Sequence, residues 1–269
     1  MSRLADVFER TRREKRVALM PFMTVGYPDF ETSLALVRAM VEAGADAIEL
    51  GIPFSDPLAD GPTIQRASYT ALQGGATPAK ALDAVRQLRD AGVEVPLILM
   101  GYCNTFLAYG EGRMVADAAL AGADGFIIVD LPPEESDETL ALCRAKGLDL
   151  IYLLAPTSDD ARIAQVTARA GGFIYCVGVV GVTGARETLA EELPIFLRRL
   201  REKTDLPLAV GFGISKRQHV EALAGLADAA IVASAIIEIV EQAPREERVA
   251  RVREYVGVLT GHAEESAGA

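Results

Sequence analysis

Ala43-Gly44-Ala45-Asp46-Ala47-Ile48-Glu49-Leu50-Gly51 is the stretch that decides the fold, because it joins the end of a helix to a buried strand. Gly44 follows an amphipathic segment over residues 31–43, where a glycine marks the end of a helix. The apolar residues after it predict a strand. The same join recurs at Ala91-Gly92-Val93, Ala121-Gly122-Ala123-Asp124 and Lys146-Gly147-Leu148. This recurrence indicates a parallel sheet covered by helices.

Eight short runs, most of them continuously apolar, predict eight strands that are covered on both faces. They span residues 17–25, 46–50, 95–100, 125–129, 149–154, 173–177, 208–210 and 229–233. Amphipathic segments predict helices over residues 31–43, 63–72, 78–91, 113–121, 134–146, 159–170 and 189–203. The pattern favours a single (β/α)8 TIM barrel with extra N-terminal and loop helices, although it leaves an open doubly wound sheet possible.

The 269 residues contain no linker or shift in composition, so we expect one barrel domain over residues 1–269, with 262–269 as a frayed tail. A formal net charge of −11 disfavours binding to nucleic acid or to an anionic membrane surface. No apolar run approaches eighteen residues, and residues 1–16 lack the apolar core of a signal peptide. Three widely spaced cysteines form no C-x-x-C pair and indicate cytosolic thiols. We therefore expect a cytoplasmic protein.

Glu49 is the strongest candidate for acid–base chemistry. In a barrel the functional loops follow the carboxyl ends of the strands, and Glu49 lies at the end of the second predicted strand. Period-two alternation places Ala47 and Glu49 on one face, with Ile48 and Leu50 on the other. If that face lines the barrel mouth, desolvation raises the proton affinity of Glu49. The alternative is a strand-end glutamate that forms a salt bridge or faces solvent.

The loop after this strand is stiff and acidic. Residues 53–62 contain three prolines, a glycine, Asp56 and Asp60 before the helix predicted over 63–72. A loop this stiff indicates that it holds a side chain in a fixed position, which makes Asp60 a candidate partner for Glu49. Turn and cap chemistry is the alternative for both aspartates.

Two turns late in the chain predict a phosphate site. Gly211-Phe212-Gly213 follows the seventh strand, and Ala233-Ser234 follows the eighth. In barrel enzymes the loops after these two strands hold phosphate on a helix N-terminus. Residues 178–186 contain three glycines and Thr183, and they predict either a mobile lid at the catalytic end or a merely flexible loop.

Polar side chains at other strand ends add further candidates. Tyr102 and Asn104 follow the third strand, and Tyr175 lies in the sixth. Each offers a hydroxyl or amide to a buried ligand, or packs in the core with its polar tip satisfied. Asp130 follows the fourth strand, where we expect it to brace adjacent loops.

Several kinds of chemistry are disfavoured. His219 and His262 are the only histidines and lie outside strand ends, which argues against a metal triad or a Ser-His-Asp arrangement. The lysines fall in helical or pre-helical stretches, including Lys216 near the phosphate turn, so no Schiff-base lysine is evident. Carboxylate acid–base chemistry on a phosphate-anchored substrate remains.

The stretches just described resemble a known family. Residues 49–62, 181–184 and 211–214 resemble the signature and later loops of the tryptophan synthase alpha subunit, and the similarity extends over essentially the whole chain. Phe22, Tyr102 and Asn104 also stand where the family pattern expects them. The resemblance implies retro-aldol cleavage of indole-3-glycerol phosphate to indole and glyceraldehyde 3-phosphate. It implies no metal and no cofactor in this chain.

The resemblance also implies roles for individual residues. Glu49 is the acid–base residue, Asp60 accepts the indole N–H and stabilises its developing charge, and Tyr175 completes the catalytic set. Phe22 and Tyr175 shape the indole pocket, and the phosphate lies on amides of Gly184, Gly213, Ala233 and Ser234. The remaining substrate-binding residues are Ile64, Tyr102, Thr183, Gly211 and Phe212. Ala233 departs from the family, which usually has glycine there, so a glycine-only backbone angle would be lost or strained. Val179 and Val180 replace more polar residues before the glycine-rich loop.

Partners follow from the resemblance as well. It implies a beta subunit that holds pyridoxal phosphate and receives indole, in an α2β2 tetramer, with the loops near Asp56 and residues 181–186 at or near the interface. Two other functions stay open. Another phosphate-binding barrel of pentose or indole metabolism would share the Gly211–Gly213 turn but not the Glu49–Asp60 loop. A non-catalytic barrel that activates a partner enzyme is disfavoured by the intact Glu49 and Asp60.

Overall fold

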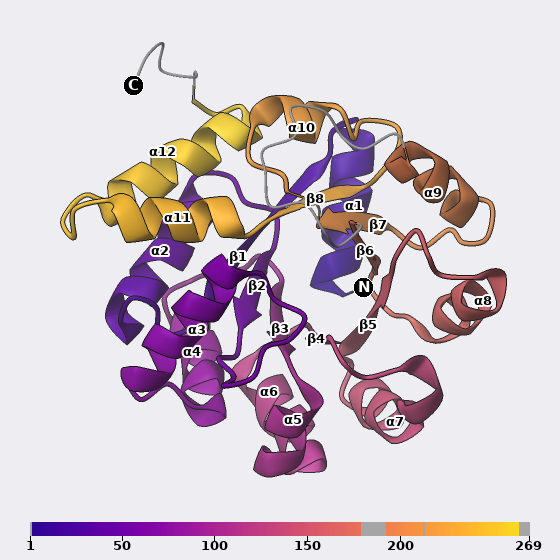
Figure 1. The fold of residues 1–269 in the computed structure, drawn as a ribbon, viewed down its shortest axis with the longest axis horizontal. Coiled ribbons are helices and arrows are strands. Elements are labelled where there is room, and N and C mark those ends of the chain that lie inside the picture. Colours follow the sequence, from indigo (N-terminus) through magenta and orange to yellow (C-terminus); the bar gives the residue numbers. More distant parts are fainter. Residues whose placement is uncertain (1, 179–191, 212, 264–269) are drawn as a thin grey trace.

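The strands close into a parallel barrel. The computed structural model describes residues 2–178, 192–211 and 213–263. Within them each strand pairs with the next in sequence, and the last pairs with the first (Figure 1). The strands are β1 (Ala18–Thr24), β2 (Ile48–Gly51), β3 (Leu97–Gly101), β4 (Gly125–Ile128), β5 (Asp149–Leu154), β6 (Ile174–Val177), β7 (Leu208–Gly211) and β8 (Ala229–Val232). The predicted (β/α)8 barrel and all eight strands are confirmed.

Helices surround the barrel (Figure 1). They are α1 (Arg3–Arg13), α2 (Phe30–Glu42), α3 (Pro62–Gln73), α4 (Pro78–Asp90), α5 (Cys103–Tyr109), α6 (Glu111–Ala121), the 3-10 turn η1 (Pro133–Glu135), α7 (Asp137–Ala145), α8 (Asp160–Arg169), α9 (Glu192–Arg201), α10 (Arg217–Glu221), α11 (Ser234–Gln242) and α12 (Arg248–Thr260). The helix predicted over 134–146 is divided at Ser136. Its buried hydroxyl bonds to the Pro133 carbonyl at 2.8 Å and to the Tyr152 hydroxyl at 2.6 Å, which fixes a turn there.

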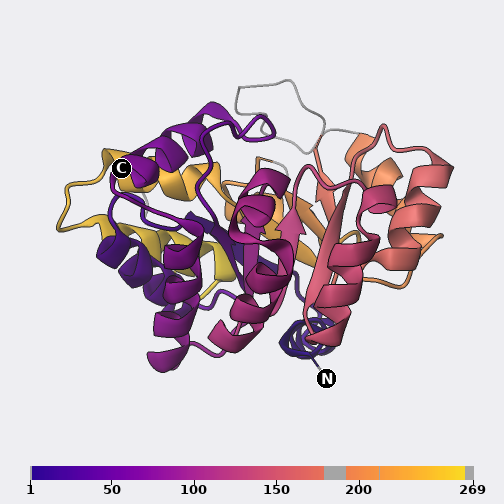
Figure 2. The same cartoon turned by 90° about the horizontal axis from the view of Figure 1, so that it is seen from below.

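The barrel interior forms a core of its own, separate from the layer between strands and helices. Alternate strand residues such as Ala47, Ile98 and Ile231 pack inside, whereas Ile48 and Leu50 pack in the outer layer. This confirms the predicted alternation along β2. Leu4, Val7 and Phe8 of α1 belong to the inner core, and Figure 2 shows α1 lying across one end of the barrel. The opposite end, where the strands have their carboxyl termini, is therefore the one available to a substrate.

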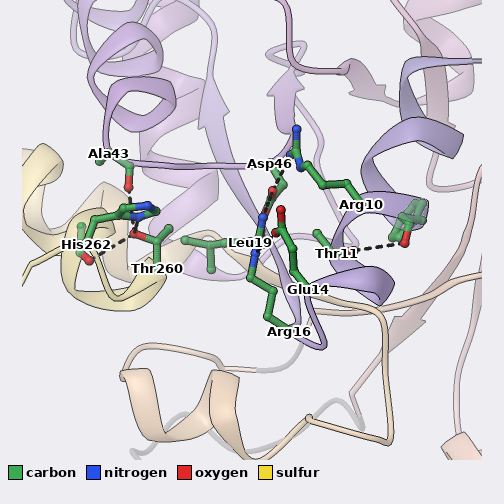
Figure 3. Close-up of polar contacts among 11 residues, drawn as sticks. Arg10, Thr11, Glu14, Arg16, Leu19, Ala43, Asp46, Thr260 and His262 are labelled. Carbon is green, nitrogen blue, oxygen red and sulfur yellow. Dashed lines mark hydrogen bonds and ion pairs between the residues drawn. The ribbon is translucent and has the colours of Figure 1, made fainter.

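Aspartates at the starts of strands fasten α1 to the barrel. Asp46, at the base of β2, accepts from Arg10 at 2.7 Å, from both terminal nitrogens of Arg16 at 2.6 and 2.8 Å, and from the Leu19 N–H at 3.0 Å (Figure 3). Burial alone would raise the pKa of Asp46, but the hydrogen bonds from Arg16 and Leu19 outweigh it, and the pKa lies below its usual value. Glu49 is thus only three residues beyond a firmly held anchor.

Asp124 and Asp228 repeat this arrangement before β4 and β8. Asp124 accepts from Arg3 of α1 at 3.0 Å and from the Leu97 N–H at 2.8 Å. Asp228 accepts from Arg12 of α1 at 3.1 Å and from the Leu208 N–H at 2.9 Å. The helix-to-strand turns that identify the fold thus also hold the helix that closes its base.

The end of α12 packs against the same turn as Asp46. The Thr260 hydroxyl donates to the Ala43 carbonyl at 2.8 Å and lies 2.9 Å from the His262 ring (Figure 3). His262 and Ala263, which the sequence places in a fraying tail, donate their N–H groups to the Gly257 carbonyl at 2.9 and 3.0 Å. Residues 264–269 lie outside the described residues. Among the described helices, none has both the length and the apolarity needed to cross a membrane.

Candidate active site

Glu49 is a fully buried carboxyl group with no partner. Its exposed fraction is 0%, and neither carboxyl oxygen has a hydrogen-bond partner within the described residues. Burial raises the pKa of Glu49 to about 8. Glu49 therefore faces no solvent and forms no salt bridge with any described residue, and burial favours its protonated form at neutral pH.

The rings of Phe22 and Tyr175 each lie over a glycine at the end of the neighbouring strand. Phe22 of β1 is in register with Glu49, and a Cβ atom on Gly51 would lie 2.7 Å from its Cε2 atom. A Cβ atom on Gly211 would lie 2.6 Å from the Cε1 atom of Tyr175. Glycine at these two positions gives both rings room at the barrel mouth.

Tyr175 is close to both candidate carboxylates. Burial raises the pKa of the Tyr175 hydroxyl well above its usual value, and the charges of Glu49 and Asp60 raise it further. Because the Coulomb interaction weakens with distance, Tyr175 lies within electrostatic reach of both carboxyl groups. These are the three residues that the resemblance assigns to catalysis.

Asp60 lies in the loop between β2 and α3. Burial raises the pKa of Asp60 to about 6, against the lowering effect of a hydrogen bond from the Tyr102 hydroxyl. The helix α3 has Gly61 as its N-cap and no side-chain cap, so Asp60 does not cap it. The Gln65 side chain donates to the Asp60 backbone carbonyl at 2.9 Å. This bond holds the backbone of the loop and does not involve the Asp60 carboxylate.

The other residues predicted at strand ends and in the Asp60 loop differ in burial and in their contacts. Ile64 is buried on α3. Asp130 accepts from the Cys103 N–H at 2.7 Å, which confirms its predicted role in bracing adjacent loops. Asp56 and Asn104 are exposed, and the Ser55 hydroxyl donates to Asp56 at 2.5 Å.

The predicted phosphate residues lie at the ends of β7 and β8. Gly213 is exposed with φ of +54°, a left-handed angle suited to glycine, and the space beside it is open. Ser234 is exposed and opens α11. The first hydrogen bond at this end runs from Ile236 N–H to the Ala233 carbonyl at 3.0 Å, so the N–H groups of Ser234 and Ala235 precede it and point out of the helix.

Ala233 carries no left-handed strain. Its φ is −122° and its ψ is −77°, so the residue is not held in a left-handed angle that only glycine adopts easily. Thr183, Gly184, Phe212, Val179 and Val180 lie outside the described residues.

His219 and Lys216 lie at the turn that begins α10. His219 accepts from the Ser215 N–H at 3.3 Å within the turn before α10, and Lys216 is exposed at the start of that helix. In the described part of the chain no group of three histidines, cysteines or carboxylates comes together to hold a metal ion.

Tyr102 has a larger part in the site than its sequence position indicates. Its hydroxyl accepts from the Ala59 N–H at 3.1 Å, and its ring stacks on Phe54 with centroids 5.1 Å apart. The sequence indicates Tyr102 as a substrate contact and gives no connection between it and Asp60. No local signal could supply one, because the residues that the hydrogen bond joins lie 43 positions apart.

Comparison with known proteins places the whole chain in one family. The family model described as tryptophan synthase alpha chain matches residues 8–266. The tryptophan synthase alpha chain of Roseiflexus castenholzii is 54% identical over 97% of this chain and 100% of its own length. That of Chloroflexus aurantiacus is 52% identical over 96% of this chain and 97% of its own length.

Comparison with solved structures indicates the same family. A structure of Mycobacterium tuberculosis tryptophan synthase superposes with a TM-score of 0.90 at 37% identity, covering 98% of this chain and 99% of that one. The tryptophan synthase alpha chain of Legionella pneumophila gives a TM-score of 0.89 at 33% identity, with 100% of both chains covered.

Proposed function

Because the chain belongs to the tryptophan synthase alpha chain family and cleaves indole-3-glycerol phosphate, we propose that Glu49 and Asp60 carry out that cleavage. The chain is a carbon–carbon lyase of tryptophan biosynthesis, and its products are indole and glyceraldehyde 3-phosphate. The observation that carries the proposal is Glu49, a fully buried, unpartnered carboxyl group whose pKa is raised to about 8.

Glu49 begins the reaction as an acid. It gives its proton to C3 of the indole ring, which leaves positive charge on the ring nitrogen and makes the ring an electron sink. The Glu49 carboxylate then takes the proton of the hydroxyl on the adjacent side-chain carbon. That carbon becomes an aldehyde as its bond to C3 breaks, and the bonding electrons return to the ring. Indole leaves with the donated hydrogen at C3, and Glu49 is protonated again.

Asp60 stabilises the intermediate. Its carboxylate accepts the indole N–H, and this hydrogen bond strengthens as positive charge develops on the nitrogen. With a pKa of about 6, Asp60 is ionised at the pH where Glu49 is still protonated. The two carboxyl groups thus take opposite roles because burial is complete at one and partial at the other.

Substrate binding uses both sides of the barrel mouth. Phe22, Ile64 and Tyr175 would enclose the indole ring, and the glycines beneath the two aromatic rings, Gly51 and Gly211, support this interpretation. The phosphate would lie on the outward amides of Gly213 and Ser234, where the α11 helix N-terminus favours an anion. The resemblance adds Thr183, Gly184 and Phe212 to this set.

Membership of the family implies a beta-subunit partner. We propose an α2β2 tetramer in the cytoplasm, in which pyridoxal phosphate serves only the beta subunit and this chain needs no cofactor. Leu58, at the tip of the Asp60 loop, has an exposed fraction of 92%, which supports a partner at this face. A shift in gel-filtration volume on addition of the cognate beta chain tests the assembly.

The cleavage assay tests the function. Purified chain incubated with indole-3-glycerol phosphate should release indole slowly alone, and the assay should be repeated with the cognate beta chain. The beta chain alone is the control. If the chain alone releases no indole and the mixture releases no more than the beta chain alone, the chain is a non-catalytic barrel.

A further inference from the structure

Tyr102 connects three parts of the Asp60 loop. It is 6% exposed at the N-cap of α5, its ring stacks on Phe54 at an interplanar angle of 27°, and its hydroxyl accepts from the Ala59 N–H. Phe54 and Ala59 lie at either end of the loop that leads to Asp60. One side chain therefore spans the loop from its start to the residue before the carboxylate.

The hydroxyl of Tyr102 has one proton, and the Ala59 contact does not use it. Ala59 is the donor in that contact, so the Tyr102 proton is free to be given to the carboxylate of Asp60, the next residue, whose pKa the Tyr102 hydroxyl lowers. Burial, followed by the charge of Asp60, raises the pKa of Tyr102 above its usual value, so the hydroxyl keeps its proton.

The backbone of Tyr102 is itself held in place. The N–H of Cys103, the next residue, donates to Asp130 at 2.7 Å at the start of α5. Asp130 follows β4, so Tyr102 is fixed to the barrel rather than to the loop. The loop is thus supported by a group whose position does not depend on it.

We propose that Tyr102 is a positioning residue for Asp60: its hydroxyl holds one carboxylate oxygen, keeps the group ionised and leaves the second oxygen to accept the indole N–H. This inference rests on the proposed role of Asp60 in the cleavage. The titratable groups that act on Asp60 or its neighbours are Tyr102, Tyr175, Glu49 and, beside Tyr102, Asp130.

The substitution Tyr102→Phe tests it, because it removes the hydroxyl and keeps the ring on Phe54. Loss of the hydrogen bond should raise the pKa of Asp60, seen directly by carbon-13 NMR of the aspartate carboxyls. For a rise of about one unit, kcat/KM for indole release should fall about fivefold at pH 6 and hardly at all at pH 8. The acidic limb of the pH profile should move upward by the same amount.

Tyr109→Phe is the matched control. Tyr109 ends the same helix, and its hydroxyl donates to Asp117 at 2.8 Å, away from the site. This variant should leave both the Asp60 titration and the pH profile unchanged. An equal loss of activity at every pH in Tyr102→Phe, with Asp60 titrating as in the wild type, would reduce Tyr102 to a packing residue and overturn the proposal.

A second measurement needs no variant at all. In the wild type the Ala59 amide proton should shift with the midpoint of the Asp60 titration, because the Tyr102 hydroxyl joins the two groups. An Ala59 shift that does not follow Asp60 would also overturn the proposal. Failure of the proposed function is distinguishable, since it would appear as unchanged cleavage by Glu49→Gln whatever Tyr102 does.

Discussion

At the scale of single residues, the site depends on two carboxyl groups in different surroundings. Glu49 is sealed inside the barrel without a partner among the described residues, whereas Asp60 is partly exposed and the Tyr102 hydroxyl lowers its pKa. Desolvation disfavours the charged form of both, but the hydrogen bond offsets part of this at Asp60. Two groups of the same chemistry thus carry different protonation states at neutral pH.

This difference predicts a bell-shaped pH profile. Activity needs Asp60 ionised and Glu49 protonated, so kcat/KM should fall below about pH 6 as Asp60 gains a proton. It should fall again above about pH 8 as Glu49 loses one. Initial rates of indole release between pH 5 and pH 10 measure it. A profile that rises steadily through pH 9 would rule out Glu49 as the starting acid.

Burial of Glu49 also predicts an effect on stability. The unfolded chain loses this proton near the ordinary value of 4.5, and the folded chain keeps it until about pH 8. The folded state binds more protons between these values, so the contribution of Glu49 to stability falls as pH rises through that window. Glu49→Gln removes the titration, and its free energy of unfolding should exceed that of the wild type by about 1–3 kcal/mol at pH 8.

Urea unfolding at pH 5 and pH 8 measures the difference. The gain should be small at pH 5 and larger at pH 8. Glu31→Gln, at an exposed position in α2, serves as the control and should show no such growth. A Glu49→Gln variant that is less stable than the wild type at pH 8 would mean that Glu49 has a partner in solution.

At the scale of elements, the ends of β2 and β7 leave room for the pocket because Gly51 and Gly211 have no side chain. Gly51 has an ordinary backbone angle, and the three atoms nearest to a Cβ atom placed there all belong to the ring of Phe22. The strand end is therefore shaped by a side chain from the neighbouring strand.

Gly51→Ala should displace the ring of Phe22. The new Cβ atom would lie 2.7 Å from Phe22 Cε2, which is closer than two non-bonded carbon atoms approach. The ring must therefore shift into the pocket. We expect KM for indole-3-glycerol phosphate to rise about tenfold. Gly112→Ala in α6 is the control, because nothing lies within 4 Å of its Cβ atom. Equal KM values in the two variants would show that Phe22 does not line the pocket.

The helix α1 predicts a second effect at this scale. Asp46→Asn removes the charge that faces Arg10 and Arg16, and it should lower the free energy of unfolding by about 2 kcal/mol at pH 7. Because the pKa of Asp46 is lowered by folding, this contribution is fully present above the ordinary value of 3.8 and is lost below it. The deficit should therefore disappear in strongly acidic solution.

Denaturant unfolding at pH 7 measures this loss, with Asp160→Asn as the control. Asp160 pairs with Arg199 on the surface, where solvent screens the interaction, so its replacement should change stability little. Equal effects of the two substitutions would show that the α1 contact does not stabilise the barrel.

At the scale of the whole molecule, the barrel could be predicted because its signals are local. Four of the buried runs follow a glycine that ends a helix, and alternation along one short strand places Glu49 inside. Helix α5 has no such local signal, because its start depends on Asp130, 27 residues away. The contact of Ala59 with Tyr102 crosses 43 residues and could not be predicted for the same reason.

The central claim is that Glu49 supplies and recovers the proton during cleavage, and Glu49→Gln tests it most directly. Calorimetry should show indole-3-glycerol phosphate binding within a few-fold of the wild type, because a glutamine side chain has the shape of the glutamate that it replaces. In single-turnover assays on the bound complex, indole release should fall by about a thousandfold or more. Bound substrate cleaved by Glu49→Gln within about tenfold of the wild-type rate would contradict the account.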